Sequence, residues 1–320
     1  MLDTVYTATD NLPRIYPGIE HTIGNTPLIA LSRIAKRKGF VANVLGKVEF
    51  MNPAGSIKDR PAYAMLKALM ASPDFTADTE LIEASSGNNG VACAWLCALY
   101  DIPLTIVIPE HMSVERQKLI RHYGANVITT PKALGTKGAI DEAARLVSER
   151  PHARSLDQFA NHANPLAHAQ TTARELLQDT QNHIDVLIAG VGTGGTLTGI
   201  AQVVTQHCPN VEVIAVEPAR CPVLSEGRAG VHNIQGLSSG HVPDVLDTDC
   251  YHHIMTVDDD EAIHWARMLA RVEGLAVGIS SGATLAAASR LATQKAYQGK
   301  NIVVILADGA ERYFSTPLFE

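Results

Sequence analysis

Residues Ile184-Asp185-Val186-Leu187-Ile188-Ala189-Gly190-Val191-Gly192-Thr193-Gly194-Gly195-Thr196 form an apolar run that leads into a glycine-rich turn. The run has the length of a buried strand, and residues 197–206 after the turn have the length of a helix. Strand, turn and helix in this order are typical of parallel sheets. The glycines also let backbone N–H groups approach a phosphate closely, and the two threonines add hydroxyl donors.

The same alternation of strand-like and helix-like segments continues along the whole chain. In the first half it predicts strands at 43–50, 81–84, 104–109 and 127–130, and helices at 63–70, 91–100, 114–123 and 138–148. In the second half it predicts strands at 186–190, 211–217, 253–257 and 302–306, and helices at 170–177, 197–206, 260–272 and 284–298. We therefore expect an α/β fold with two domains, each a mostly parallel twisted sheet flanked by helices. The smaller, mobile domain is predicted at 42–156, and the larger one at 1–41 and 157–320, with the ligand between them.

Two further segments have the composition of a reactive site. Asn52-Pro53-Ala54-Gly55-Ser56-Ile57-Lys58-Asp59-Arg60 presents one lysine on a turn before a predicted helix, where an amine can form a Schiff base. Taken alone, Lys58 would be interpreted as a solvated surface residue. Ser85-Ser86-Gly87-Asn88-Asn89-Gly90 lies between a predicted strand and a helix, and the unpaired amides of a helix N-terminus suit an anion.

In their order and spacing these motifs resemble the cysteine synthase family of pyridoxal-phosphate enzymes. This fold type II group includes the O-acetylserine sulfhydrylases and the cystathionine β-synthases. The resemblance covers nearly the whole chain and includes Gly24-Asn25-Thr26-Pro27-Leu28, Pro109-Glu110-His111-Met112-Ser113-Val114-Glu115-Arg116, Gly124-Ala125-Asn126, Gln158-Phe159-Ala160-Asn161, Ile234-Gln235-Gly236, Gly278-Ile279-Ser280-Ser281-Gly282 and Glu311-Arg312-Tyr313-Phe314-Ser315-Thr316.

The resemblance implies a binding site for pyridoxal 5'-phosphate. Lys58 would supply the amine for the imine and later remove the α-proton, which requires a lowered pKa. The phosphate would be held by Gly192, Thr193, Gly194, Gly195 and Thr196. Asn88 would contact the phenolic oxygen, and Ser280 the pyridine nitrogen. A hydroxyl at Ser280 keeps the ring a weak electron sink, which favours β-elimination to an aminoacrylate and addition of a nucleophile. Ser280 or Ser281 could instead cap the helix that follows.

The resemblance also implies residues that bind the substrate. Its carboxylate would contact Ser85, Ser86, Asn89 and Gln158. The family commonly has threonines where Ser85 and Asn89 stand, so Asn89 narrows the pocket and leaves the preferred substrate open. Residues Gly236, Ser238 and Ser239 would border the substrate entrance. Ser238, Ser239 and His241 also depart from the family pattern, either as determinants of specificity or as neutral changes.

The expected reaction is that of a cysteine synthase, which converts O-acetyl-L-serine and sulfide to L-cysteine and acetate. The chain has no long extension around this core, so we expect the short architecture rather than that of cystathionine β-synthase. Alternatives within the family are O-phosphoserine as donor, homocysteine or an amine as nucleophile, and a cysteine lyase or desulfhydrase that releases hydrogen sulfide. Arg220 and Arg228 could approach a charged donor, although surface arginines are the simpler interpretation. The resemblance further implies a homodimer and a serine acetyltransferase as a possible partner.

Two hypotheses outside this reaction class remain. Gly190-x-Gly192-x-x-Gly195 after a strand fits an NAD-binding fingerprint, and Glu217 stands where a ribose-binding acid is expected. That hypothesis assigns no role to Lys58, Asn88 or Ser280. A catalytically silent paralogue is the other, and the intact Lys58 argues against it.

Composition agrees with a soluble enzyme, and the length is enough for two domains. The 320 residues are 46% hydrophobic and 18% charged, and the net charge of −7 argues against nucleic-acid partners. Residues 1–17 contain no apolar stretch of the kind found in signal peptides, so we expect a cytoplasmic protein without a membrane segment. The five cysteines lack the paired spacing of a metal site, and we expect no metal. Cys93 and Cys97 are predicted to be buried as small hydrophobic residues.

Overall fold

The computed structural model describes residues 15–110 and 112–320. The prediction for the first 14 residues, including the absence of an export signal there, lies outside this part of the chain. So does His111 of the quoted family motifs.

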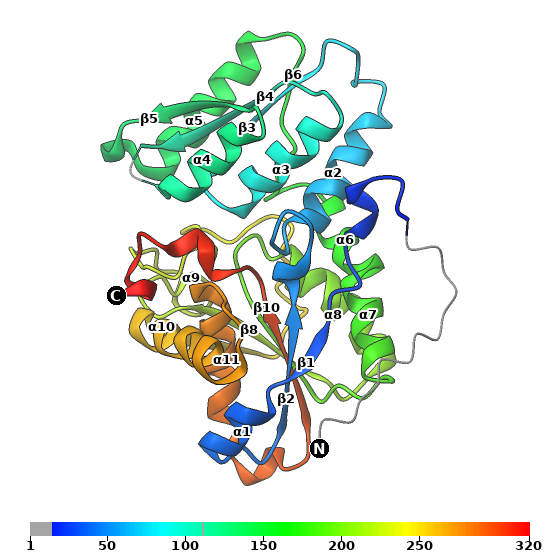
Figure 1. Ribbon diagram of the computed structural model, residues 1–320, viewed down its shortest axis with the longest axis vertical. Helices are drawn as coiled ribbons and strands as arrows, with labels where there is room; N and C mark the ends of the chain where they lie inside the picture. The colour runs from blue at the N-terminus through cyan, green and yellow to red at the C-terminus, as the bar shows by residue number, and fades with distance from the viewer. Residues whose placement is uncertain (1–14, 111) are drawn as a thin grey trace.

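The described residues form two separate sheets, as Figure 1 shows. In the larger sheet β1 pairs antiparallel with β2, and the other strand pairs are parallel. Its strands, in spatial order, are β1 (Leu28–Ala30), β2 (Asn43–Val48), β10 (Asn301–Leu306), β7 (Val186–Gly190), β8 (Glu212–Pro218) and β9 (His253–Val257). The smaller sheet is entirely parallel, with the order β5 (Asn126–Thr130), β4 (Leu104–Pro109), β3 (Glu80–Ala84) and β6 (Ala153–Arg154). The predicted α/β fold with mostly parallel sheets is confirmed.

Helices cover both faces of the larger sheet. The apolar residues of α10 and α11 pack on one face, and those of α7 and α8 pack on the other. The described helices are α1 (Ser32–Lys38), α2 (Asp59–Met70), α3 (Asn88–Leu99), α4 (Val114–His122), α5 (Gly135–Glu149), α6 (Ala163–Gln170), α7 (Thr172–Asp179), α8 (Gly195–His207), α9 (Val223–Glu226), α10 (Asp259–Met268) and α11 (Ile279–Ala292). The central strands β7, β8 and β10 are therefore almost wholly apolar, as expected for strands buried on both faces.

Strand β2 lies in a different sheet from the one predicted. The sequence placed residues 42–48 in the smaller domain, whereas β2 pairs with β1 and β10 of the larger sheet. The order of elements along the chain shows that a strand exists, but it does not show which distant strand will pair with it. Here the partner β10 lies about 250 residues further along, so no local pattern could identify the pairing.

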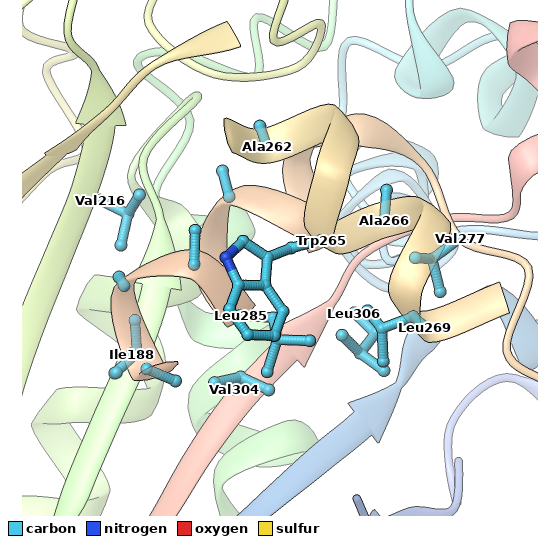
Figure 2. Close-up of a cluster of buried hydrophobic side chains, with 14 of the residues drawn as sticks. Ile188, Val216, Ala262, Trp265, Ala266, Leu269, Val277, Leu285, Val304 and Leu306 are labelled. Atoms are coloured by element: carbon cyan, nitrogen blue, oxygen red, sulfur yellow. The ribbon is translucent and has the colours of Figure 1, made fainter. Parts of the chain in front are cut away.

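Helices α10 and α11 pack closely in the largest apolar cluster. Gly282 makes this approach possible, because a Cβ atom there would collide with the carbonyl oxygen of Ala262. Trp265 of α10 and Leu285 of α11 point into the same cluster, over Val304 and Ile188 of the sheet (Figure 2). This packing holds α11 against the sheet, and so it also positions residues 278–282 at the start of that helix.

Among the described residues, none of the helices has both the length and the apolar composition that crossing a bilayer requires.

Shortening Leu285 tests the importance of this cluster. Leu285 is fully buried, so Leu285→Ala leaves a cavity, and we expect a loss of about 2–5 kcal/mol in the free energy of unfolding. The control is Leu166→Ala at a half-exposed helical position, where a change below about 0.5 kcal/mol is expected. Urea unfolding followed by circular dichroism measures both values, and equal losses would contradict the assignment of the core.

Candidate active site

A cleft of about 480 Å³ lies between the two sheets and collects most of the predicted site residues. The strands of both sheets contribute the residues that follow their carboxyl ends, which is where ligands bind in parallel α/β folds. The predicted residues that line it are Lys58, Ser85, Ser86, Asn88, Asn89, Gln158, Gly192, Thr193, Gly194, Thr196, Gly236, Ser239 and Ser280. Of the predicted set, Gly195 and Ser238 lie outside this lining.

Lys58 places its amine inside this cleft. It is the residue before the first turn of α2, and Pro61 occupies that turn, as the sequence predicted. Its Nζ donates to Oγ1 of Thr193 at 3.3 Å. Burial lowers the pKa of Lys58 from 10.5 to about 8, because the charged amine loses its contact with water. The other lysine on the cleft wall, Lys137, is mostly exposed and pairs with Asp141 at 2.7 Å.

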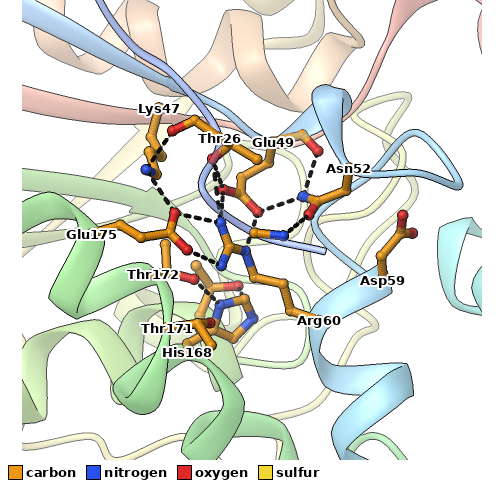
Figure 3. Close-up of polar contacts among 12 residues, drawn as sticks. Thr26, Lys47, Glu49, Asn52, Asp59, Arg60, His168, Thr171, Thr172 and Glu175 are labelled. Atoms are coloured by element: carbon orange, nitrogen blue, oxygen red, sulfur yellow. Dashed lines mark hydrogen bonds and ion pairs between the residues drawn. The ribbon is translucent and has the colours of Figure 1, made fainter. Parts of the chain in front are cut away.

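A buried ion cluster holds the helix that carries Lys58 (Figure 3). The guanidinium of Arg60 is fully buried and donates to both carboxylate oxygens of Glu49, at 2.7 and 2.8 Å. It also donates to both oxygens of Glu175 on α7, at 2.6 and 2.8 Å. Such paired contacts fix a guanidinium in orientation as well as in position. The start of α2 is therefore bound to the larger sheet and its helix, two residues from the reactive amine.

The rest of the cluster completes the charges around Arg60. Lys47, also fully buried, lies 2.8 Å from Glu175 and donates to the carbonyl of Thr26 at 2.6 Å. Although burial opposes it, hydrogen bonds from Arg60 and Lys47 lower the pKa of Glu175 to about 2. The sequence did not predict this cluster. The sequence signal that could have revealed it is Lys47, a lysine within a mostly apolar strand.

The glycine turn forms a cup facing the amine of Lys58. Gly194 has a φ of 80°, which favours glycine, and it is the residue before the first turn of α8. Within that turn the Gly195 amide donates to Oγ1 of Thr193 at 3.4 Å. A Cβ atom at Gly192 would collide with the carbonyl of Gly236, so the backbones of these two segments are in close contact. Thr193 and Thr196 direct hydroxyl groups to this cup, and Thr196 contacts the buried His168 at 3.2 Å. The free amides and hydroxyls suit a phosphate.

Asn88 is locked in orientation by residues near the C-terminus. Its Oδ1 accepts from Arg312 at 2.7 Å, and its Nδ2 donates to Asp308 at 2.6 Å. Asp308 also accepts from the hydroxyl of Tyr313 at 2.6 Å. These contacts leave one N–H of the Asn88 amide for a ligand. Arg312 and Tyr313 belong to one of the family motifs, but the sequence did not predict their contacts with this site.

The residues predicted to bind a substrate carboxylate line the cleft from two segments of the chain. Ser85 accepts from the Gly90 amide at 3.0 Å, so its hydroxyl proton points elsewhere. Asn89 is buried, and its side-chain oxygen and nitrogen have no hydrogen-bond partner within the described part of the chain. Gln158 approaches from the segment that links the two sheets. A buried amide without a partner indicates that a polar ligand completes this part of the cleft.

Ser280 lies on the cleft wall, as predicted, and the alternative, in which Ser280 or Ser281 caps the helix, is wrong. Helix α11 begins at Ile279 after Gly278, so both serines lie inside its first turn and neither caps it. Ser281 instead accepts from the Ala307 amide at 2.9 Å and ties α11 to the end of β10. Ser280 is nearly buried and lines the cleft, and its hydroxyl takes no part in the bond to the Ala307 amide.

The three residues considered in the entrance loop do not all face the cleft. Ser239 and His241 line the cleft, and the ring of His241 lies 5.5 Å from that of Phe159. Ser238 points away from it, because its φ of 38° turns the hydroxyl toward Cys221, whose carbonyl accepts at 3.2 Å. The prediction that Ser238 binds substrate therefore does not fit this geometry.

The surroundings of Glu217 argue against the dinucleotide-binding hypothesis. The buried Glu217 carboxylate accepts from the amides of Leu224 and Ser225, at 2.7 and 3.1 Å, so it is not available to a ribose.

Arg220 and Arg228 are exposed, as the simpler interpretation predicted. Cys93 and Cys97 are buried, which confirms their prediction as packing residues. In the described part of the chain no group of potential ligands has the geometry of a metal site.

The wall of the cleft matches what pyridoxal phosphate requires. It combines an amine of lowered pKa, an anion cup formed by backbone amides, an oriented amide at Asn88 and a hydroxyl at Ser280. An amine opposite a phosphate cup is the combination that such a cofactor needs.

Comparisons with known proteins agree with this geometry. A family model described as pyridoxal-phosphate dependent enzyme matches residues 19–308. Cysteine synthase B of Campylobacter jejuni subsp. jejuni is 42% identical over 306 residues, which cover 96% of this chain and 99% of that protein. The crystal structure of O-ureido-L-serine synthase is similar with a TM-score of 0.91, 38% identity and 95% of each chain covered. A hydrogen sulfide-producing enzyme from Fusobacterium nucleatum has a TM-score of 0.89 and 38% identity, covering 94% of this chain and 99% of that one.

Removing Arg60 tests the cluster that anchors α2. Arg60→Ala leaves the Glu49 and Glu175 carboxylates buried without their partner, and we expect a loss of about 3–5 kcal/mol in the free energy of unfolding. The control is Arg145→Ala, which also removes contacts to two carboxylates, Glu142 and Glu149, but on an exposed helix face. No measurable change is expected there. Urea unfolding of both variants makes the comparison, and a similar small effect for Arg60→Ala would contradict the anchoring role.

Proposed function

Because the chain belongs to the family of pyridoxal-phosphate-dependent enzymes, we propose that it synthesises L-cysteine from O-acetyl-L-serine and sulfide. The reaction replaces the β-substituent of the amino acid and releases acetate. The observation that carries this proposal is the enclosed amine of Lys58, 3.3 Å from Thr193 in the glycine turn. Pyridoxal phosphate supplies the electron sink that makes the α-proton acidic and the β-substituent labile.

In this proposal different residues of the cleft bind different parts of the cofactor and the substrate. The amides of Gly192, Gly194 and Gly195 hold the phosphate together with the hydroxyls of Thr193 and Thr196. Asn88 donates its free N–H to the phenolic oxygen, and Ser280 meets the ring nitrogen. Ser85, Ser86, Asn89 and Gln158 bind the substrate carboxylate. The unpartnered side-chain amide of Asn89 supports that role, because its N–H groups would donate to a carboxylate.

Lys58 is the proposed base for the α-proton. A lysine accepts a proton only when it is neutral, and the lowered pKa keeps about a tenth of such amines neutral at pH 7. An unperturbed lysine would be neutral in fewer than about one molecule in a thousand at that pH. The hydroxyl of Thr193 accepts from the amine and orients its lone pair within the cleft. Closure of the smaller sheet over bound substrate would keep water from the reacting atoms.

A different nucleophile or donor is the second candidate function. Ser239 and His241 line the cleft, and the resemblance indicates that they depart from the common family pattern. Two of the similar structures carry other activities, since one is named O-ureido-L-serine synthase and the other a hydrogen sulfide-producing enzyme. A larger nucleophile such as an amine or homocysteine, O-phosphoserine as donor, or release of hydrogen sulfide from cysteine would use the same Lys58.

We also propose a setting for the enzyme. The family resemblance supports a cytoplasmic homodimer, with serine acetyltransferase as a possible partner. The exposed rings of Phe314 and Phe319, 4.9 Å apart, offer an apolar surface that suits association. The smaller sheet and its helices would move over bound substrate, while the Arg60 cluster keeps Lys58 with the larger sheet.

The test of the reaction is an assay of amino-acid products. The holoenzyme with sulfide should form L-cysteine from O-acetyl-L-serine faster than from O-phosphoserine, and Lys58→Ala should lower the turnover at least about a thousandfold. Lys67→Ala removes an amine from the far end of the same helix and is expected to keep full activity. Cysteine formation by Lys58→Ala at the normal rate, or a β-replacement product only with another donor and nucleophile, would overturn the proposal.

The pKa of Lys58 predicts how fast the cofactor attaches at different pH. The neutral amine is the nucleophile, and its fraction rises about tenfold between pH 7 and pH 9 for a pKa of about 8. The rate of the spectral change after pyridoxal phosphate is mixed with cofactor-free protein should rise accordingly and then level off. A rate that keeps rising to pH 10.5 would show an ordinary lysine.

A further inference from the structure

A buried carboxylate lies behind the cleft, and the proposed reaction assigns it no role. Glu83 is near the end of β3, two residues before Ser85, and its side chain is enclosed in the protein. Burial raises the pKa of Glu83 to about 6, while hydrogen bonds from residues 155–157 limit that rise. At pH 7.5 the group is therefore a buried carboxylate. The neighbouring thiols of Cys93 and Cys97 have raised pKa values through burial and stay neutral at this pH.

Glu83 holds the segment that connects the two sheets. Its Oε1 accepts a short hydrogen bond from the Leu156 amide and another from the Ser155 hydroxyl at 2.9 Å. The Ser155 hydroxyl in turn accepts from the amide of Asp157 at 3.3 Å. One carboxylate oxygen thus organises three consecutive residues of the connection.

The same segment carries a strained residue directly before the cleft. Asp157 has a φ of 48°, a left-handed conformation that costs a non-glycine residue on the order of 1 kcal/mol. The next residue, Gln158, lines the cleft. Its carbonyl accepts from Asn164 at 2.8 Å, and Asn164 also donates to Thr193 of the glycine turn at 3.1 Å. Gln158 is therefore held on one side by the larger sheet and on the other by Glu83.

Glu83 also belongs to the strand that delivers the opposite part of the site. Strand β3 leads without a break into Ser85, Ser86 and Asn89, so the position of Glu83 sets the start of that loop. We propose that Glu83 is a positioning residue that fixes Gln158 relative to the Ser85–Asn89 loop, so that both contact the substrate carboxylate. This inference rests on the proposed function of these residues. It predicts that loss of the charge weakens amino-acid binding without weakening cofactor binding.

The chain contains a matched control for this idea. Glu217 is another buried carboxylate that accepts from two backbone amides and one serine hydroxyl, those of Leu224 and Ser225. It lies outside the lining of the cleft. Glu83→Gln and Glu217→Gln therefore remove the same charge from similar surroundings, and a general loss of stability would affect both. A specific loss of substrate binding is expected only for Glu83→Gln.

The experiment titrates each holoenzyme with L-alanine, an amino acid without a leaving group, and follows the visible spectrum of the cofactor. We expect Glu83→Gln to raise the dissociation constant of L-alanine about tenfold and the KM for O-acetyl-L-serine similarly, with retention of pyridoxal phosphate unchanged. Glu217→Gln should bind L-alanine within twofold of the parent protein. Equal effects of the two substitutions, or no effect of Glu83→Gln, would overturn the inference.

Two further variants keep the outcomes distinct. Gln158→Ala should weaken L-alanine binding, and if it does not, the proposed carboxylate site and the role of Glu83 are both wrong. If Gln158→Ala weakens binding while Glu83→Gln does not, only the role of Glu83 is wrong. Should Glu83→Gln fail to fold, Ser155→Ala removes one of its donors. A smaller rise in the same dissociation constant would then support the inference, and an unchanged constant would overturn it.

Discussion

The position of the reactive amine depends on one buried ion pair system. Arg60 is enclosed between the carboxylates of Glu49 and Glu175, which come from separate elements of the larger sheet and its helices. Buried charges need such complete pairing, because each carries a desolvation cost of several kcal/mol. A guanidinium that satisfies two carboxylates has few alternative positions. Since Lys58 lies two residues away, this constraint also fixes the direction in which its side chain leaves α2.

Helix α2 consequently joins the two halves of the molecule. Its first turn is bound to the larger sheet through Arg60, whereas Ala62, Met65 and Leu66 belong to the apolar cluster around the smaller sheet. The glycine turn follows β7 of the larger sheet, so the same sheet positions this turn and, through Arg60, the amine of Lys58. The smaller sheet brings the Ser85–Asn89 loop to them. Asn88 joins that loop to Asp308 and Arg312 near the C-terminus, so contacts from both sheets meet at the cleft.

Much of the fold could be predicted because its central strands are continuous apolar runs between turn residues, and the predicted bounds of β4, β7 and β9 match the structure. Helix starts were less accurate. The first turn of α11 contains polar residues that serve the cleft or a neighbouring strand, so it lacks the apolar spacing of a helix. Helix α6 was missed because Pro165 interrupts its pattern, although proline is tolerated in a first turn. The cofactor residues followed from motifs, whereas the Arg60 cluster joins residues more than a hundred positions apart and has no local signature.

The central claim is that pyridoxal phosphate is bound covalently through Lys58. The direct measurement is mass spectrometry of peptides after the holoenzyme is reduced with borohydride, which makes the link to the lysine permanent. The account predicts a single pyridoxyl phosphate label, on the peptide that contains Lys58, at close to one label per chain. A label on Lys137 or another lysine, or a protein that takes up no label from supplied cofactor, would contradict it.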